Sequence, residues 1–321
     1  MSKTIALIGN QNCGKTTLFN CITGSNQYVG NWPGVTLDKV TGFVASHNYK
    51  VTDLPGLYSL SPYSPEERVS RDYLLSGDYD VIVNIVDATH IERSLSLSCE
   101  ILSFKRPMVI VLNMMDLAQK QQISIDIDKL SQSFGVPVVA ISAAKKEGID
   151  ELFKAVDQAC VATCSVLDEK LASSLNNVAN LITEHEFEGS RNFIALSLLQ
   201  HDHAYMDEYA HNEKVLTQVN KEILELEKTY STDVESLAAQ ERYAFIDGVI
   251  AKAVTKGKGR NNNLSKRIDD IVTNRFLALP IFAFIVYMVY YLAVSTIGTM
   301  GTDYANDVLF GEYASNGATA L

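Results

Sequence analysis

The sequence predicts a doubly wound α/β domain with one antiparallel edge strand, followed by a small all-α domain and one transmembrane helix. Three observations support this fold class. Apolar strand-like runs alternate with helix-like runs up to about residue 165. From 166 to 260, proline is absent and apolar residues recur at helical spacing. Residues 276–297 carry no charge, and about 20 such residues cross a bilayer as a helix.

Residues 1–165 are expected to form the first domain. The alternation of runs favours parallel strands with helices on both faces of the sheet. Only His47 and Asn48 separate two of the strand-like runs, so these runs are expected to form a hairpin that makes one edge strand antiparallel. The strand-like runs are Ile5–Ile8, Gly42–Ser46, Tyr49–Thr52, Val81–Val86, Met108–Leu112 and Val136–Ile141. The helix-like runs are Thr17–Ile22, Glu66–Leu75, Glu92–Phe104, Asp126–Phe134 and Ile149–Thr163.

Residues 166–260 are expected to form the helical domain. Apolar residues recur at helical spacing in two stretches, one beginning at Leu171 and the other at Leu216. Two of its histidines, His201 and His203, stand two residues apart, which does not place them on one face of a helix. We therefore interpret them as solvated surface residues rather than metal ligands.

The C-terminal part divides into a polar linker and amphipathic lead-in (261–275), the transmembrane helix (276–298) and a tail (299–321). Basic residues precede the apolar segment and acidic residues follow it, so the positive-inside bias places the N-terminal domains in the cytoplasm. A buried helix of a soluble protein is the alternative. One helix cannot enclose a transport path, so we expect either a truncated chain or assembly with other chains.

Composition excludes some classes of protein. The net charge is −11 without blocks of like charge, which argues against nucleic acid as a partner. The five cysteines are odd in number and form no C-x-x-C pair, which fits a reduced cytosolic setting better than a disulfide framework. The first residues do not read as a signal peptide.

The pattern G-x-x-x-x-G-K-[ST] occupies residues 9–16, between a strand-like run and a helix-like run. This context predicts a phosphate-binding loop. Backbone N–H groups and the helix N-terminus would surround phosphate oxygens, Lys15 would reach the β- and γ-phosphates, and the Thr16 hydroxyl would bind Mg²⁺. Cys13 lies inside this loop, where its thiol is either acidified by the helix N-terminus or simply a small residue that the loop tolerates.

Three further motifs follow in the order that a GTPase requires. Asp53-Leu54-Pro55-Gly56 ends a strand-like run; Asp53 would support the Mg²⁺ shell and the Gly56 N–H would sense the γ-phosphate. Asp116, in Asn113-Met114-Met115-Asp116, would accept both N1–H and the exocyclic amine of guanine and so select GTP over ATP. The backbone of Ser142-Ala143-Ala144 would donate to the guanine O6. All four motifs would meet at the carboxyl edge of the sheet.

These motifs place the chain among the P-loop GTPases, and the residues between them narrow the resemblance. Residues 29–36 (Val-Gly-Asn-Trp-Pro-Gly-Val-Thr) and 53–67 resemble the two switch regions of bacterial ferrous-iron transport protein B (FeoB). So does Val86-Asp87-Ala88-Thr89 with Glu92 and Arg93. The resemblance continues through Glu241–Ile246 into the apolar C-terminal segment and covers essentially the whole chain.

The resemblance implies a K⁺ site formed by the Asn12 side chain and the backbone carbonyls of Gly30 and Trp32. It also implies that Thr36 joins Thr16 and Asp53 around Mg²⁺. The expected catalytic set is Asn12, Lys15, Thr36 and Gly56. The residues expected to contact the nucleotide are Gly9, Asn10, Gln11, Asn12, Cys13, Gly14, Lys15, Thr16, Thr17, Gly34, Val35, Thr36, Asp53, Gly56, Asn113, Met114, Asp116, Ser142, Ala143 and Ala144.

Two positions depart from common GTPase patterns. Leu57 stands where many GTPases carry a water-orienting glutamine, which predicts slow hydrolysis unless K⁺ at Asn12 supplies the missing charge. Met114 replaces a lysine that normally packs on the base, so nucleotide exchange is expected to be fast. Glu66 and Glu67 either orient water or serve as ordinary residues at a helix start.

The sequence therefore predicts the GTP-hydrolysing cytoplasmic part of a FeoB-like transporter in the bacterial inner membrane. Its expected partners are GTP and GDP, Mg²⁺ and K⁺, the lipid bilayer, Fe²⁺ as the transported ion, and the remaining membrane portion or further copies of the chain. The alternatives are a soluble regulatory GTPase of ribosome or tRNA maturation and a membrane-anchored ATPase. The first would carry a basic RNA-binding domain, and Asp116 argues against the second.

Overall fold

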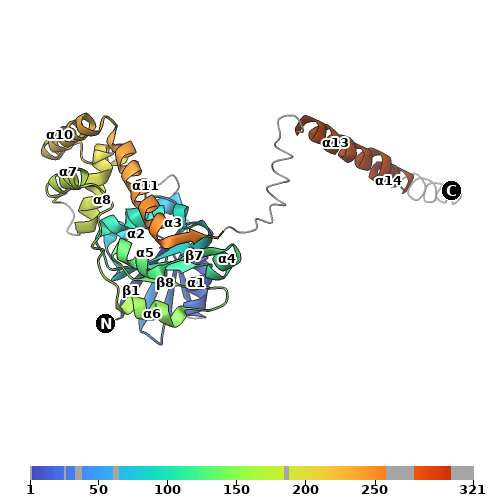
Figure 1. The fold of residues 1–321 in the computed structure, drawn as a ribbon, viewed down its shortest axis with the longest axis horizontal. Helices are drawn as coiled ribbons and strands as arrows, with labels where there is room; N and C mark the ends of the chain where they lie inside the picture. The colour runs from blue at the N-terminus through green and yellow to red at the C-terminus, as the bar shows by residue number, and fades with distance from the viewer. Residues whose placement is uncertain are drawn as a thin grey trace, which may run out of the picture. The chain divides into compact units, whose positions relative to one another are not determined.

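The structure is a computed structural model that describes residues 2–24, 27–32, 38–60, 65–183, 188–257 and 278–304. The chain forms two compact units, residues 1–257 and 258–321 (Figure 1). Several predicted features lie outside the described residues: Gly34, Val35 and Thr36 of the first switch, the linker and lead-in at 261–275, and most of the tail.

The first unit is built on a seven-stranded sheet of order β2-β3-β4-β1-β5-β6-β8. Strands β4, β1, β5, β6 and β8 pair in parallel, whereas β3 runs antiparallel to β4 and to β2. The predicted mixed sheet with its hairpin at His47-Asn48 is thus confirmed, and β2 adds one further strand to that edge. The strands are β1 (Lys3–Gly9), β2 (Gln27–Asn31), β3 (Asp38–Val44), β4 (Tyr49–Asp53), β5 (Val81–Asp87), β6 (Met108–Asn113) and β8 (Val138–Ala140).

Hydrophobic layers fill both faces of the sheet. Side chains alternate along β1, so that Ile5 and Leu7 join the core under one set of helices while Ala6 and Ile8 join the other. The first core lies under α1 (Lys15–Thr23) and α6 (Ile149–Asp157). The second lies under α2 (Pro65–Ser76), α3 (Ile91–Ile101) and α5 (Ile127–Phe134). Two 3₁₀ turns flank α3, namely Ala88–His90 and Leu102–Phe104.

Helix α6 is shorter than the expected run to Thr163. It ends at Asp157, and the chain then turns so that the Met108 N–H donates to the Cys160 carbonyl at 3.0 Å. This bond gives the Met108 N–H a partner at the start of β6, before the pairing of β6 with β8 begins at Ile110.

The helical domain consists of α7 (Glu169–Ala179), α8 (Glu188–Leu199), α9 (His203–Glu208), α10 (Glu213–Tyr230) and α11 (Val234–Ala253). Acidic N-caps start three of these helices; Asp202, for example, accepts from the Ala204 N–H at 3.0 Å. His201 and His203 flank that cap and are both exposed. Helix α8 packs on the first domain, where the Ser190 hydroxyl donates to the Leu75 carbonyl at 2.6 Å.

A second sheet, of two strands, connects the end of α11 to the first domain. Strand β9 (Val254–Lys256) follows α11 directly and pairs antiparallel with β7 (Ile123–Ile125). Strand β7 itself follows α4 (Met115–Lys120). Helix α11 also packs on α5, with the Phe245 ring 5.3 Å from that of Phe134.

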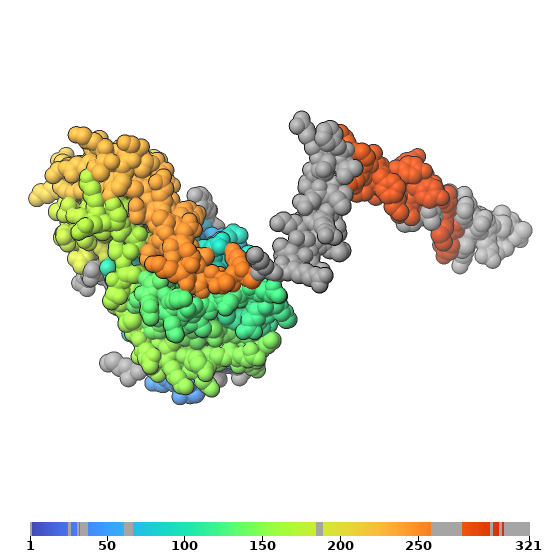
Figure 2. Space-filling view, viewed as in Figure 1, coloured from blue at the N-terminus to red at the C-terminus, as the bar shows by residue number. Residues whose placement is uncertain are grey.

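The second unit contains the apolar helix. Among the residues that the structure describes, 278–301 is long and apolar enough to cross a membrane, with a mean hydropathy of 2.0. It comprises α13 (Ala278–Tyr291), a π-helical segment (Leu292–Gly298) and α14 (Thr299–Tyr304). None of the apolar window is buried within the structure. Figure 2 draws the described residues of this segment in orange-red.

Candidate nucleotide site

The loop between β1 and α1 has the geometry of a phosphate cradle. Gly14 adopts φ +85°, and a Cβ there would lie 2.3 Å from the Asn113 amide nitrogen, so only glycine fits. A Cβ on Gly9 would lie 2.6 Å from the Ile85 carbonyl oxygen. Helix α1 begins at Lys15 with Gly14 as its N-cap, and a glycine has no side chain to occupy the N–H groups of the first turn. These groups can therefore receive an anion.

Lys15 and Asp53 meet beside this loop. They form an ion pair, and their side chains are only 10% and 11% exposed. Burial raises the pKa of Asp53, and the charge of Lys15 and its hydrogen bond act against that rise. The pair places one cation and one carboxylate at the carboxyl end of β4, where phosphates and Mg²⁺ of a nucleotide would compete for them.

The second switch begins against the phosphate loop. A Cβ on Gly56 would lie 3.3 Å from the Gln11 Cα atom, and the Leu57 N–H donates to the Gly9 carbonyl at 3.3 Å. The Leu57 side chain is fully buried in the core. It therefore cannot orient water, as the sequence predicted. Glu67 is buried on α2 and accepts from the Tyr58 N–H at 3.5 Å; the Glu66 side chain lies outside the described atoms.

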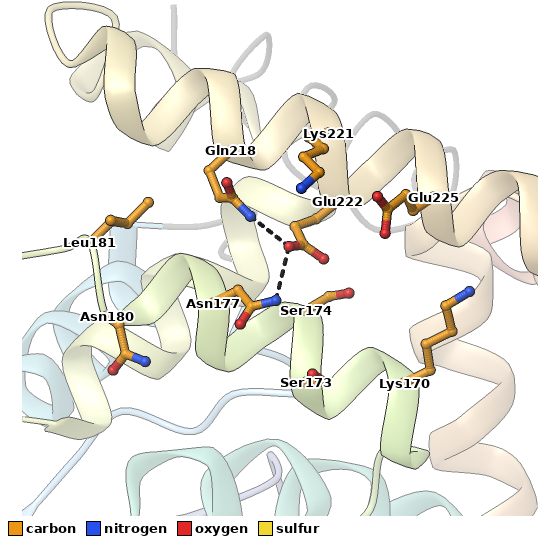
Figure 3. A pocket seen from close by; sticks show the side chains of 10 residues that line it. All are labelled: Lys170, Ser173, Ser174, Asn177, Asn180, Leu181, Gln218, Lys221, Glu222 and Glu225. Atoms are coloured by element: carbon orange, nitrogen blue, oxygen red, sulfur yellow. Dashed lines mark hydrogen bonds between the residues drawn. The ribbon is translucent and has the colours of Figure 1, made fainter.

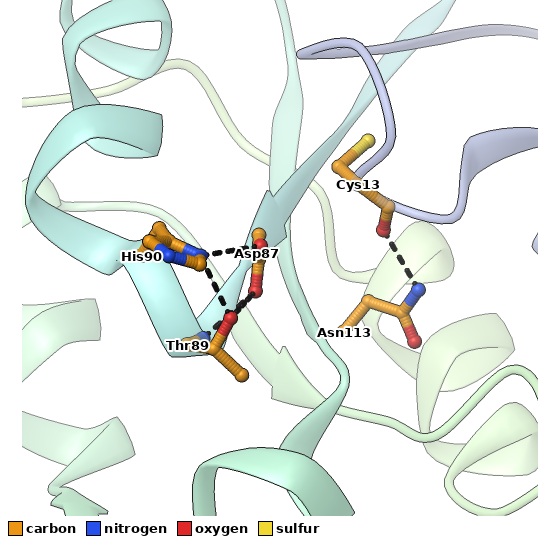
Figure 4. Close-up of polar contacts among 5 residues, drawn as sticks. All are labelled: Cys13, Asp87, Thr89, His90 and Asn113. Carbon is orange, nitrogen blue, oxygen red and sulfur yellow. Dashed lines mark hydrogen bonds and ion pairs between the residues drawn. The ribbon is translucent and has the colours of Figure 1, made fainter. Parts of the chain in front are cut away.

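Asn113 joins the phosphate loop to the loop that follows β8. Its Nδ2 donates to the Cys13 carbonyl at 2.9 Å (Figure 4), and its Oδ1 accepts from the Ala143 N–H at 3.0 Å. Asn113 is only 3% exposed. Met114 follows with φ +62° and starts α4, which brings its Cε atom within 3.6 Å of a Cβ built on Gly14. The sequence analysis listed Asn113 among the nucleotide-binding residues but missed its bridging role.

Asp116 faces the loop that follows β8. Its Oδ1 accepts from the Ser142 hydroxyl at 3.1 Å, and the Lys145 ammonium lies 3.6 Å from its Oδ2. Partial burial raises the pKa of Asp116, but the Ser142 hydrogen bond and the Lys145 charge outweigh it, so the pKa lies below its ordinary value. The carboxylate is held ionised and oriented, as an acceptor for two donors of a base requires. Lys145 was not among the predicted residues, since nothing in its spacing distinguishes it from a solvated lysine.

Cys13 is a buried residue of the loop. It is 1% exposed, and burial raises the pKa of its thiol to about 11 against the lowering influence of Lys15. Acidification by the helix N-terminus, one of the two interpretations from the sequence, is therefore wrong. The thiol fills space next to Gly9 and serves as a small apolar residue.

The described part of the first switch contains two of the three residues implied for K⁺. Gly30 lies in β2 opposite Lys39 of β3. Trp32 is 5% exposed, with its ring 5.4 Å from Tyr73 of α2 and the Lys39 ammonium 4.7 Å above it. The third, Asn12, is exposed in the phosphate loop with φ +63°. The amide and carbonyl oxygens of these residues suit a hard cation, and the Thr16 hydroxyl and Asp53 carboxylate suit Mg²⁺.

The segment after β5 is fixed by its own polar contacts. Asp87 accepts from the Thr89 N–H at 2.8 Å and from its hydroxyl at 2.6 Å, and its other oxygen lies 3.1 Å from the His90 Nδ1 (Figure 4). Asp87 stands opposite Asn113 in the sheet register. These contacts set the start of α3 beside the end of β6.

A separate cavity of about 500 Å³ lies between α7 and α10 of the helical domain (Figure 3). Glu222 on its wall is 5% exposed and accepts from Asn177 at 3.0 Å and from Gln218 at 2.6 Å. Burial raises the pKa of Glu222, but hydrogen bonds from Ser174 and these amides outweigh it and leave the pKa below its ordinary value. The ionised Glu222 carboxylate on α10 thus links α10 to α7 through its hydrogen bond from Asn177.

Comparisons with known proteins agree with this architecture. A family model described as ferrous iron transport protein B (FeoB_N) matches residues 3–156, and the FeoB cytosolic helical domain model matches residues 168–255. The Fe(2+) transporter FeoB of Salmonella typhimurium is 36% identical over 92% of this chain, and that of Legionella pneumophila (strain Lens) is 35% identical over 91%. The chain spans 39% of the length of each.

Solved structures give the same result. A GDP-bound mutant of S. thermophilus NFeoB superimposes with a TM-score of 0.73 at 40% identity, covering 79% of this chain and all of that one. S. thermophilus NFeoB bound to GDP.AlF4- and K⁺ gives a TM-score of 0.68 at 41% identity, covering 77% and 98%. The chain therefore belongs to the FeoB family and carries that family's GTPase and cytosolic helical domains.

Proposed function

We propose that this chain binds and hydrolyses GTP and is the cytoplasmic, nucleotide-dependent part of an Fe²⁺ transporter. The observation that carries the proposal is the convergence of Lys15, Asp53, Gly56, Asn113 and Asp116 at the carboxyl edge of one sheet. This is the edge at which open α/β sheets bind ligands. The similarity to GDP-bound NFeoB of S. thermophilus supports it.

Each part of the site has a proposed role toward the nucleotide. The N-terminus of α1 and Lys15 would hold the phosphates, Thr16 and Asp53 would hold Mg²⁺, and Thr36 would join them in the GTP state. Asp116 would accept from guanine, while Ser142 orients it. The Gly56 N–H would meet the γ-phosphate and so connect the second switch to the state of the nucleotide.

We propose further that K⁺ stimulates a slow hydrolysis. Leu57 is buried, so the usual water-orienting side chain is replaced by one that cannot hydrogen-bond. Asn12, Gly30 and Trp32 offer oxygens that would hold K⁺, whose charge would stabilise the phosphates in the transition state. The K⁺-containing structure of S. thermophilus NFeoB supports this assignment.

The membrane role is inferred from the apolar helix and from the curated relatives. Residues 278–301 would cross the bacterial inner membrane, with the GTPase domain (1–165) and helical domain (166–260) in the cytoplasm. One helix leaves no shielded path, so Fe²⁺ passage would require further membrane segments or further copies of the chain. The relatives named Fe(2+) transporter support iron as the cargo.

GTP hydrolysis by the wild type and by Asn12→Ala in equimolar KCl and NaCl tests the proposal. We expect the wild type to hydrolyse GTP faster in K⁺, and the variant to lose that difference while still binding GDP. Asn48→Ala is the matched control, because Asn48 also has a left-handed backbone (φ +56°) and is exposed, but it lies in the β3–β4 hairpin. Equal rates in both salts for the wild type would refute the K⁺ site, and absence of hydrolysis in both would refute the GTPase.

A further inference from the structure

Helix α3 lies between the second switch and α11, the helix that precedes β9. Its Glu100 carboxylate accepts from the Leu60 N–H at 2.7 Å and from the Ser59 hydroxyl at 3.1 Å. Both donors belong to the second switch, three and four residues after Gly56. One side chain on α3 therefore holds the middle of the second switch, whose first residues lie against the phosphate loop.

A second contact from α3 reaches the same segment. The Arg93 guanidinium lies 4.5 Å from the centre of the Tyr58 ring, a cation–π distance. Arg93 and Glu100 together contact three consecutive residues of the switch, Tyr58, Ser59 and Leu60. Glu100 accepts hydrogen bonds from two residues of this segment, whereas Arg93 makes one ring contact, so Glu100 is the more directional of the two anchors.

The opposite connections of α3 run to the end of the helical domain. Helix α11 packs on α3. Burial raises the pKa of Glu100 above its ordinary value, against the lowering influence of the Arg242 charge on α11 and of the hydrogen bonds from Leu60 and Ser59. At the other end of α3, Glu92 pairs with Lys256 of β9 at 2.8 Å. Helix α3 thus contacts the second switch, α11 and β9.

We propose that Glu100 is a positioning residue that holds the Ser59–Leu60 part of the second switch in place for GTP hydrolysis. The Leu60 N–H and the Ser59 hydroxyl both donate to the same carboxylate oxygen, so one side chain of α3 fixes two consecutive residues of the switch. This inference rests on the proposed GTPase function.

The test compares Glu100→Gln with Glu92→Gln in the full chain. Both variants remove one carboxylate from α3, but among the described residues Glu92 pairs with Lys256 of β9 rather than with Ser59 or Leu60. We expect Glu100→Gln to lower kcat roughly tenfold, with the KM for GTP and the Kd for GDP within about twofold, since GDP has no γ-phosphate for the switch to meet. Glu92→Gln should leave kcat within about twofold. Equal loss of kcat in both variants, or a parallel loss of GDP affinity in Glu100→Gln, would show a merely structural role.

Amide hydrogen exchange supplies a direct readout of the hold on the switch. In Glu100→Gln the Leu60 amide should exchange faster than in the wild type, because its acceptor is weakened, whereas in Glu92→Gln its exchange should be unchanged. Unchanged Leu60 exchange in Glu100→Gln would overturn the proposal.

Two controls keep the inference separable from the proposed function. If Glu100→Gln does not fold, Ser59→Ala removes one donor from the switch side and should lower kcat roughly threefold without changing GDP affinity. A wild type that binds no GDP and hydrolyses no GTP would refute the proposed function. An active wild type whose Glu100 and Ser59 variants keep full kcat would refute only the inference.

Discussion

Replacing Asn113 with alanine removes the side chain that connects the phosphate loop to the loop that follows β8. The amide makes two hydrogen bonds, to the Cys13 carbonyl at 2.9 Å and from the Ala143 N–H at 3.0 Å. All three residues are at least 97% buried, so water cannot replace the lost partner without opening the site. The substitution therefore leaves one backbone acceptor and one backbone donor unpaired.

The free-energy cost of Asn113→Ala follows from these two unpaired backbone groups. A buried polar group that loses its partner costs about 1–3 kcal/mol, so two such groups cost about 2–6 kcal/mol in total. That is a large fraction of the roughly 5–15 kcal/mol that stabilises a domain. Because both groups belong to loops that would hold the nucleotide, part of the cost should appear as lost affinity, with a Kd for GDP raised about 10- to 100-fold.

The assay measures GDP binding by calorimetry and the free energy of unfolding by denaturant titration of the same variants. Asn84→Ala is the matched control: Asn84 is also fully buried on a central strand, but it accepts from Ser98 of α3 at 2.7 Å and touches neither loop. We expect Asn84→Ala to lower stability while leaving the Kd for GDP within about twofold. If Asn113→Ala binds GDP as tightly as Asn84→Ala does, the bridging role is refuted.

Two further predictions concern the carboxylates. Asp116→Asn should weaken GDP binding by about two orders of magnitude and strengthen xanthosine diphosphate binding, because an amide matches the carbonyl that xanthine carries in place of the guanine amine; unchanged selectivity in a competition titration would contradict the assigned role. Glu222→Gln should lower the free energy of unfolding at pH 7 by about 1–3 kcal/mol, and Glu225→Gln on the exposed face of α10 by much less. Because the folded pKa of Glu222 is depressed, its stabilisation is present above the unfolded pKa of about 4.3 and is lost as pH falls through the folded value, so the difference between the two variants should vanish in acid.

The sequence contained enough information for most of the first domain. Each of the six predicted strand-like runs corresponds to a strand of the seven-stranded sheet, and the predicted mixed pairing is observed. Strands β2, β7 and β9 were missed because they are short and lie at edges, where pairing and not apolar content defines them. The contact of β9 with β7 joins residues far apart in sequence, which no local pattern indicates.

For the site, local motifs located the loops but not the contacts between them. The phosphate loop and Asp116 could be assigned because their spacing reflects one chemical task each. The bridge through Asn113 and the anchoring of the second switch by Glu100 depend on side chains brought together by the sheet and by α3. The sequence left the pKa of the Cys13 thiol open for the same reason. Burial raises this pKa and the helix N-terminus lowers it, and the structure shows that burial has the larger influence.

The most direct test of the account is a titration of the wild-type chain with GDP, ADP and xanthosine diphosphate in the presence of Mg²⁺. The arrangement of Asp116, Ser142 and Asn113 predicts that GDP binds at least about 100-fold more tightly than either of the others, because only guanine offers two donors to the Asp116 carboxylate. Equal binding of the three nucleotides, or binding of none, would contradict the account.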